Sequence, residues 1–127
     1  MVPFAMLPGG RAFVIHVSRL ATHTNDMLAV PAVGLLVTAS LDAAQTPLAL
    51  PRASIQGRAH RCEAESSVYR EAREVYLAKL PEAEELFGFP DFFLFMIEPS
   101  TVRYVAGFGR ALSLNREQVA EILEGAA

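Results

Sequence analysis

Segments with strand character dominate this chain, and most of them are joined by links too short to hold a crossover helix. Apolar patterning predicts six strands, over residues 1–6, 12–17, 33–38, 48–62, 92–97 and 101–106. Parallel strands need long helical crossovers, whereas antiparallel strands can be joined by hairpins. The pattern therefore favours a mainly β fold, a small antiparallel barrel with peripheral helices, over a doubly wound α/β sheet.

Three finer expectations concern these strands. The run over 33–38 is almost continuously apolar, which is typical of a strand covered on both sides. The segments 92–97 and 101–106 are expected to form a hairpin that turns at 98–100. Pro51 should mark a bend or an edge position in the long strand, because proline cannot donate to the ladder.

Helical spacing predicts a short helix ending near Ala29, a longer helix over 66–79 and a short one over 82–87. Thr22 or Thr24 can cap the first of these helices. Asn115 is placed to cap a final helix, with Gln118 in the position of a capping box.

The composition is that of one folded domain with an excess of apolar residues. Of 127 residues, 52% are hydrophobic and 20% are charged, which allows one core and favours a buried subunit interface. The net charge of −3 and the scattered basic residues do not fit a nucleic-acid binder. No apolar run is long enough to span a bilayer and no secretory leader is visible, so the cytoplasm is the expected compartment.

Few residues with catalytic or metal-binding chemistry are grouped in the sequence. Cys62 is the only cysteine, which excludes an internal disulfide and a cysteine-based metal site and predicts a buried apolar role. No Ser-His-Asp set, metal-ligand cluster or carboxylate pair occurs at a useful spacing. His16 is expected to be a satisfied or surface histidine. Any chemistry would therefore be carried by a cofactor.

The strongest candidate site is a polar turn between the strand over 12–17 and the first helix. It holds Ser18, Arg19, Thr22, His23 and Thr24. Hydroxyls, a guanidinium, an imidazole and the free N–H groups at a helix start suit a phosphate group. The alternatives are a solvated turn and an ordinary helix start with an exposed histidine.

Several segments, taken in order, resemble one family. They are Ser18-Arg19-Leu20-Ala21, His23-Thr24, the run 31–37, the run 51–57, the helix end 76–81, Asp91-Phe92 and the run 107–111. This order is similar to the FMN-binding split barrels related to pyridoxamine 5'-phosphate oxidase, and most of all to their haem-utilisation branch. The resemblance covers nearly the whole chain. It implies one split-barrel domain over 1–127 and a homodimer with two FMN molecules in clefts formed by both subunits.

The resemblance also implies which residues contact the cofactor. Ser18 and Thr24 would donate to the phosphate, and Arg52 would reach the flavin from a neighbouring strand or subunit, unless it is a plain surface arginine. The Gly-Phe-Gly-Arg segment would bend close to the planar ligand or merely cover the barrel end. The predicted cofactor-binding residues are Val2, Pro3, Phe4, Ser18, Arg19, His23, Thr24, Arg52, Phe108 and Arg110, the first three through backbone groups.

Three departures from the family pattern bear on function. The family has a strand before Val2, so the first strand is either truncated or dispensable here. Asn25 and Asp26 stand where the branch carries a basic residue and then asparagine, so one phosphate cation is missing and a carboxylate opposes an anion. The extension that supplies an iron ligand in haem-degrading relatives is not among these 127 residues. We therefore expect loose haem association at most, without haem degradation.

The expected function is that of an FMN-dependent oxidoreductase acting on an unknown small substrate other than pyridoxamine phosphate. One alternative is a non-catalytic protein that binds flavin or haem, and another is a dimeric barrel that has lost its cofactor. FMN is the favoured cofactor and haem the less favoured one.

Overall fold

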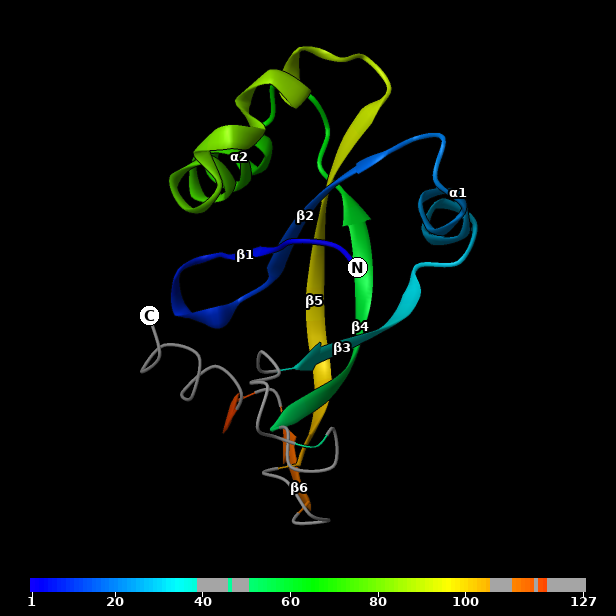
Figure 1. Ribbon diagram of the computed structural model, residues 1–127, viewed down its shortest axis with the longest axis vertical. Coiled ribbons are helices and arrows are strands. Elements are labelled where there is room, and N and C mark those ends of the chain that lie inside the picture. Colours follow the sequence, from blue (N-terminus) through cyan, green and yellow to red (C-terminus); the bar gives the residue numbers. More distant parts are fainter. Residues whose placement is uncertain (39–45, 47–50, 106–110, 116, 119–127) are drawn as a thin grey trace.

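A computed structural model describes residues 1–38, 46, 51–105, 111–115 and 117–118 (Figure 1). Its strands are β1 (Ala5–Met6), β2 (Phe13–Ser18), β3 (Ala32–Thr38), β4 (Arg52–Arg61), β5 (Phe92–Val105) and β6 (Ala111–Asn115). Its helical segments are η1 (Pro8–Gly10), α1 (Thr22–Ala29), α2 (Ser67–Lys79) and η3 (Pro81–Gly88). The strands form one sheet in the order β1-β2-β5-β4-β3, with β6 paired to β5. Every described pairing is antiparallel, as the sequence predicts.

β5 is the central strand and it runs through the whole molecule (Figure 1). Its first half pairs with β2 and its second half with β6, while β4 pairs along most of its length. The expected hairpin at 98–100 is therefore wrong. Pro99 lies opposite Gly57, where the β4 register shifts between Gln56 and Gly57. A bulge tolerates a residue that cannot donate to the ladder, so the strand continues through the proline.

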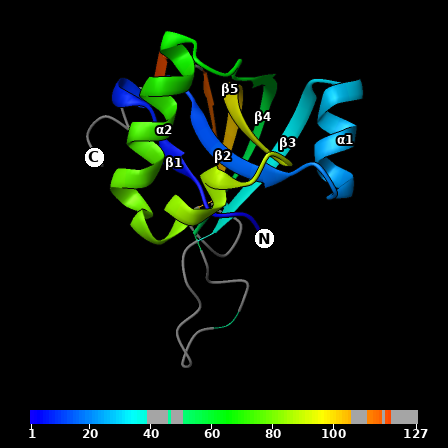
Figure 2. The same cartoon turned by 90° about the horizontal axis from the view of Figure 1, so that it is seen from above.

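The sheet carries an apolar cluster on each face, because side chains alternate along its strands. Phe13, Ile15 and Val17 of β2 share one face, as predicted, and pack with Phe95 and Ile97 of β5. The opposite face packs against α2 and η3, through the residues Leu7, Val14, Cys62, Ala72, Tyr76, Ala83 and Leu94. α1 lies away from α2, at the β3 side of the sheet (Figure 2). The interior thus follows the predicted barrel with peripheral helices.

β3 differs from the expectation of a strand covered on both sides. It is an edge strand, and Val33, Leu35 and Val37 pack against the core while the alternate residues are exposed. Leu36 is 66% exposed and Val30, just before the strand, 61%. A continuous apolar run is typical of a strand covered on both faces, but among the described residues only one face of β3, the last strand of the sheet, is covered.

The helix starts test the capping predictions. The residue at the N-cap of α1 is Ala21, which has an extended backbone and makes no side-chain capping hydrogen bond. The expected cap by Thr22 or Thr24 is therefore wrong. α2 is capped by Ser66, whose hydroxyl accepts from the Tyr69 N–H at 3.1 Å. The capping box at the C-terminal end is confirmed.

In that box the Gln118 N–H donates to the Asn115 side chain at 2.9 Å, and the Asn115 N–H donates to the Gln118 side chain at 3.0 Å. The rest of the helix expected there lies outside the described residues. Cys62 is free and buried, as predicted, and burial raises the pKa of its thiol to about 11. Among the described residues, none of the helices combines the length and the apolar character needed to cross a bilayer.

Candidate functional site

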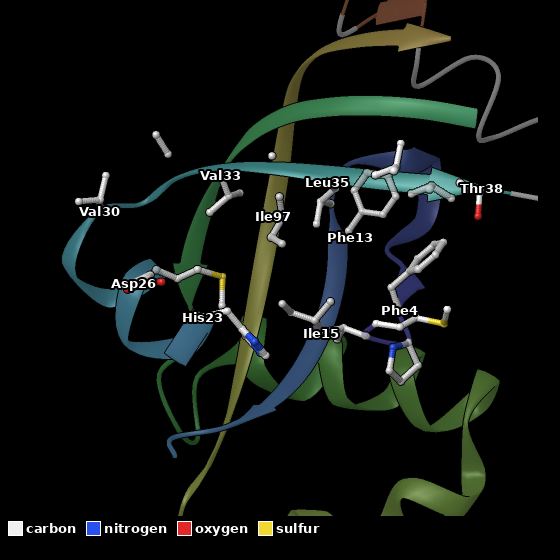
Figure 3. Close-up of a pocket in the computed structure, with 18 of the residues that line it drawn as sticks. Phe4, Phe13, Ile15, His23, Asp26, Val30, Val33, Leu35, Thr38 and Ile97 are labelled. Atoms are coloured by element: carbon white, nitrogen blue, oxygen red, sulfur yellow. The ribbon is translucent and has the colours of Figure 1, made fainter. Parts of the chain in front are cut away.

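A cavity of about 1050 Å³ opens on the concave face of the sheet, between the N-terminal segment, α1 and β3 (Figure 3). The chain start (Met1–Phe4) forms one wall, and residues of α1 and β3 form the opposite one. Phe13 and Ile15 of β2 and Ile97 of β5 form the floor. Its size lies at the upper end of the roughly 300–1,000 Å³ typical of small-molecule sites.

The lining is mostly aliphatic and aromatic. Its polar side chains are His23 and Asp26 of α1, Thr38 at the end of β3 and Lys79 at the end of α2. Figure 3 shows His23 and Asp26 on one side of Ile15 and Phe4 on the other. An apolar cavity with a few polar groups at its margins suits a large, mainly apolar ligand with polar side groups.

Lys79 holds the N-terminal wall in place. Its Nζ donates to the Phe4 carbonyl oxygen at 2.5 Å and lies 4.2 Å from the centroid of the Phe4 ring. The Phe4 ring in turn meets Phe13 edge-on, with centroids 5.4 Å apart. A charge-assisted hydrogen bond and a cation–π contact therefore attach the chain start to α2 and to the cavity floor.

The predicted phosphate turn is a tight local structure. Thr24 is fully buried, and its hydroxyl donates to the Ser18 carbonyl oxygen at 2.6 Å. The Ser18 hydroxyl accepts from the Leu20 N–H at 3.1 Å, and the Arg19 N–H donates to the Asp91 carbonyl at 2.6 Å. The Arg19 side chain is exposed. Ser18, Arg19 and Thr24 are not among the cavity residues, so their phosphate role stays a prediction.

The other predicted cofactor residues divide into two groups. Val2, Pro3, Phe4 and His23 all line the cavity. Arg52 begins β4, where its register partners are Thr38 and Val105, and it does not line the cavity. Phe108 and Arg110 lie outside the described residues. The structure thus gathers Val2, Pro3, Phe4 and His23 of the predicted set around one cavity.

Lys79 is a cavity residue that no sequence motif predicts. In the sequence it is simply the last residue of an amphipathic helix before Pro81, a position that usually favours a lysine because of the helix dipole. Its place at the cavity depends on a contact with Phe4, which lies 75 residues away along the chain. No local pattern reports such a contact.

His16 belongs to a separate cluster on the other face of the sheet. It is 8% exposed, and among the described residues its Nδ1 has no hydrogen-bond partner. The expectation of a satisfied or surface histidine is therefore wrong. Aromatic rings surround it, which explains both the burial and the lack of partners. Within the described part of the chain no group of three or more His, Cys, Asp and Glu side chains could hold a metal ion.

Comparisons with known proteins agree with this fold. The chain is 37% identical over 111 residues, 87% of its length, to the non-canonical haem oxygenase HOZ of Arabidopsis thaliana chloroplasts. It superposes on a haem-binding protein from Mycobacterium smegmatis with a TM-score of 0.83 and 30% identity, over 94% of this chain. It matches Campylobacter jejuni ChuZ with a TM-score of 0.77 and 18% identity, over 92% of this chain. No protein-family profile matches.

These likenesses confirm the predicted fold class, a mainly β antiparallel split barrel with peripheral helices. The chain spans 32% of the length of the Arabidopsis protein and 48% of that of each of the other two. Two of the three similar proteins are named for haem. The fold and the cavity define a split-barrel domain similar to haem proteins.

Proposed function

We propose that this chain binds haem in the cavity between the N-terminal segment, α1 and β3. The observation that carries the proposal is the cavity itself, large and apolar with polar groups only at its margins. A tetrapyrrole is a flat, mostly apolar ring with anionic side groups, which matches that distribution. The likeness to the Arabidopsis and Mycobacterium proteins supports haem over the FMN that the sequence favours.

His23 is the candidate iron ligand. Its imidazole lines the cavity and is exposed there, and neutral imidazole is a common axial ligand of haem iron. The chain has two other histidines. His16 is buried on the opposite face, and His60 lies on β4 with its Nε2 3.7 Å from a Glu98 carboxylate oxygen. Neither lines the cavity.

Titration with hemin tests this proposal. In place of the loose association expected from the sequence, we expect a saturable one-to-one complex with a shifted Soret band. His23→Ala should change the Soret position and weaken binding about tenfold or more. His60→Ala is the matched control and should leave the complex unchanged. Absence of saturable binding by the wild-type chain would overturn the proposal. An unaltered spectrum of the His23 variant would exclude only His23 as the ligand.

FMN is a second candidate, supported by one observation. His23 belongs to the polar turn region and also lines the cavity, so a flavin ring in the cavity could place its phosphate near the start of α1. If FMN binds in this way, the proposed activity is that of an FMN-dependent oxidoreductase acting on an unknown small substrate. Titration by flavin fluorescence tests it, and Arg52→Ala should weaken FMN about tenfold if Arg52 assists the phosphate. Unchanged affinity would remove Arg52 from the site.

The outer face of β3 supports a homodimer. β3 is an edge strand whose exposed residues include Leu36, and Leu28 and Val30 beside it are 47% and 61% exposed. An apolar edge of this kind is normally covered. We propose that a second copy covers it, so that the cavity lies at the margin of the subunit interface.

A further inference from the structure

The cavity has opposite charges on its two sides. Asp26 on α1 and Lys79 at the end of α2 both line it, and the Lys79 ammonium lies beside Phe4. Figure 3 places Asp26 and Phe4 on opposite sides of Ile15. A ligand with a charged side group would therefore experience different potentials at the two sides. An anionic group is repelled at the Asp26 side and attracted at the Lys79 side.

The Lys79 ammonium has donors to spare. An ammonium carries three N–H donors, and one of them is used by the Phe4 carbonyl oxygen. Within the described part of the chain, no carboxylate oxygen lies within 4.0 Å of its Nζ. Lys79 lines a cavity whose other residues are mostly apolar, and an ammonium forms a shorter and stronger hydrogen bond with a carboxylate than with a neutral carbonyl.

From these observations we infer that Lys79 binds a carboxylate of the ligand and so orients it with its anionic edge toward the N-terminal segment. The inference rests on the proposed haem function and adds the orientation of the bound ligand to it. Lys79 can keep its hydrogen bond to Phe4 while a second donor meets the carboxylate. The ligand would then be connected through Lys79 to the segment Met1–Phe4, which already forms one wall of the cavity.

The experiment compares hemin with its dimethyl ester, which has the same ring and iron but no carboxylate. Both are titrated against the 127-residue wild-type chain and the Lys79→Met, Lys79→Arg and Arg70→Met variants, in one buffer. Arg70 is the control, because it lies on the same helix with its guanidinium donating to the Glu65 carbonyl and does not line the cavity. Lys79 is exposed, but its replacement removes the contacts with Phe4, so circular dichroism checks the fold and an unchanged affinity for the ester checks the cavity wall.

We expect the wild-type chain to bind hemin about tenfold or more tightly than the ester. Lys79→Met should remove that preference by weakening hemin alone, Lys79→Arg should restore most of it, and Arg70→Met should have no effect. A Lys79→Met variant that keeps the preference, or that weakens both compounds equally, would overturn the orientation.

Two further results separate this inference from the function on which it rests. Equal, saturable binding of hemin and ester by the wild-type chain would leave haem binding standing and overturn the role of Lys79. Binding of neither compound would overturn both. Amide hydrogen exchange adds an independent readout, because hemin should slow exchange in the segment 1–6 of the wild-type chain and not in Lys79→Met.

Discussion

The imidazole of His16 stacks on the ring of Phe87, with centroids 3.8 Å apart and planes inclined by 5°. Tyr76 and Phe92 complete the surroundings, with ring centroids 5.9 Å and 5.1 Å from that of His16. One side chain of β2 thus contacts rings from α2, η3 and the start of β5. The guanidinium carbon of Arg73 lies 5.2 Å from the centroid of the Phe87 ring, so a cation borders this stack.

Stability should depend on pH through this histidine. Burial lowers the pKa of His16 to about 4, against 6.5 for a free side chain. Above about pH 6.5 the imidazole is neutral in both the folded and the unfolded chain. As the pH falls toward 4 the unfolded chain takes up a proton that the folded chain does not, so the free energy of unfolding decreases. We expect a loss of roughly 1–2 kcal/mol between pH 7 and pH 5.

His16→Phe keeps the aromatic stack and cannot be protonated, so it should lose that part of the pH dependence. Urea unfolding at pH 7, 6 and 5 measures it. His60→Gln, at an exposed site, is the control and should keep the wild-type slope. His16→Leu is a second variant without a titratable group, in case the larger phenylalanine ring of His16→Phe packs poorly. Equal slopes for the wild type and both His16 variants would contradict the prediction.

Gly57→Ala should destabilise the sheet by about 1–3 kcal/mol. A β carbon at this position would lie 2.5 Å from the Glu98 carbonyl oxygen and 3.2 Å from a side-chain carbon of Ile97, so the backbone of β5 would have to move. Gly34→Ala is the matched control on the neighbouring strand, where the closest atom is 3.8 Å away, and it should change stability by less than about 0.5 kcal/mol. Thermal unfolding measures both, and similar melting temperatures would show that β5 adjusts at the bulge.

Thr24→Val should destabilise the chain by about 1 kcal/mol, because the partly buried Ser18 carbonyl loses its hydroxyl donor and keeps the Ala21 N–H. Thr22→Val, in the same turn of α1 and exposed, should be nearly neutral. Denaturant unfolding measures the difference. FMN titration of the same folded variants tests the predicted phosphate role. A tenfold weaker complex for Thr24→Val alone would support it, and equal affinities would remove this hydroxyl from the site.

The wild-type chain should have the mass of two chains in light scattering at micromolar concentration. Leu36→Glu should convert it to a monomer, because a charge on the exposed face of β3 would oppose burial against a second copy. Val68→Glu is the control, since Val68 is an exposed apolar residue of α2, 41% accessible and away from β3. A wild-type monomer would refute the dimer, and a dimeric Leu36→Glu variant would place its interface elsewhere.

Local patterns in the sequence determined much of the secondary structure of this protein and the class of its fold. The alternation in β2 placed Phe13, Ile15 and Val17 on one face, because period two is a property of the strand itself. The spacing of Asn115 and Gln118 predicted a reciprocal pair of hydrogen bonds that needs only three residues of chain. Short links between most of the predicted strands favoured an antiparallel barrel, although one of them, the expected turn at 98–100, lies inside β5.

Contacts between distant segments decided the strand register, the edge of the sheet and the position of the cavity. In the sequence Pro99 is typical of a turn, but in the structure it lies opposite Gly57 at a bulge of β4. The apolar run of β3 is typical of a buried strand, but β3 is the last strand of the sheet. The cavity joins Phe4, His23 and Lys79, which lie far apart along the chain, and no periodicity can report their meeting. Register, edges and cavities depend on which strands pair and which helix covers them, so they emerge only when the whole chain is folded.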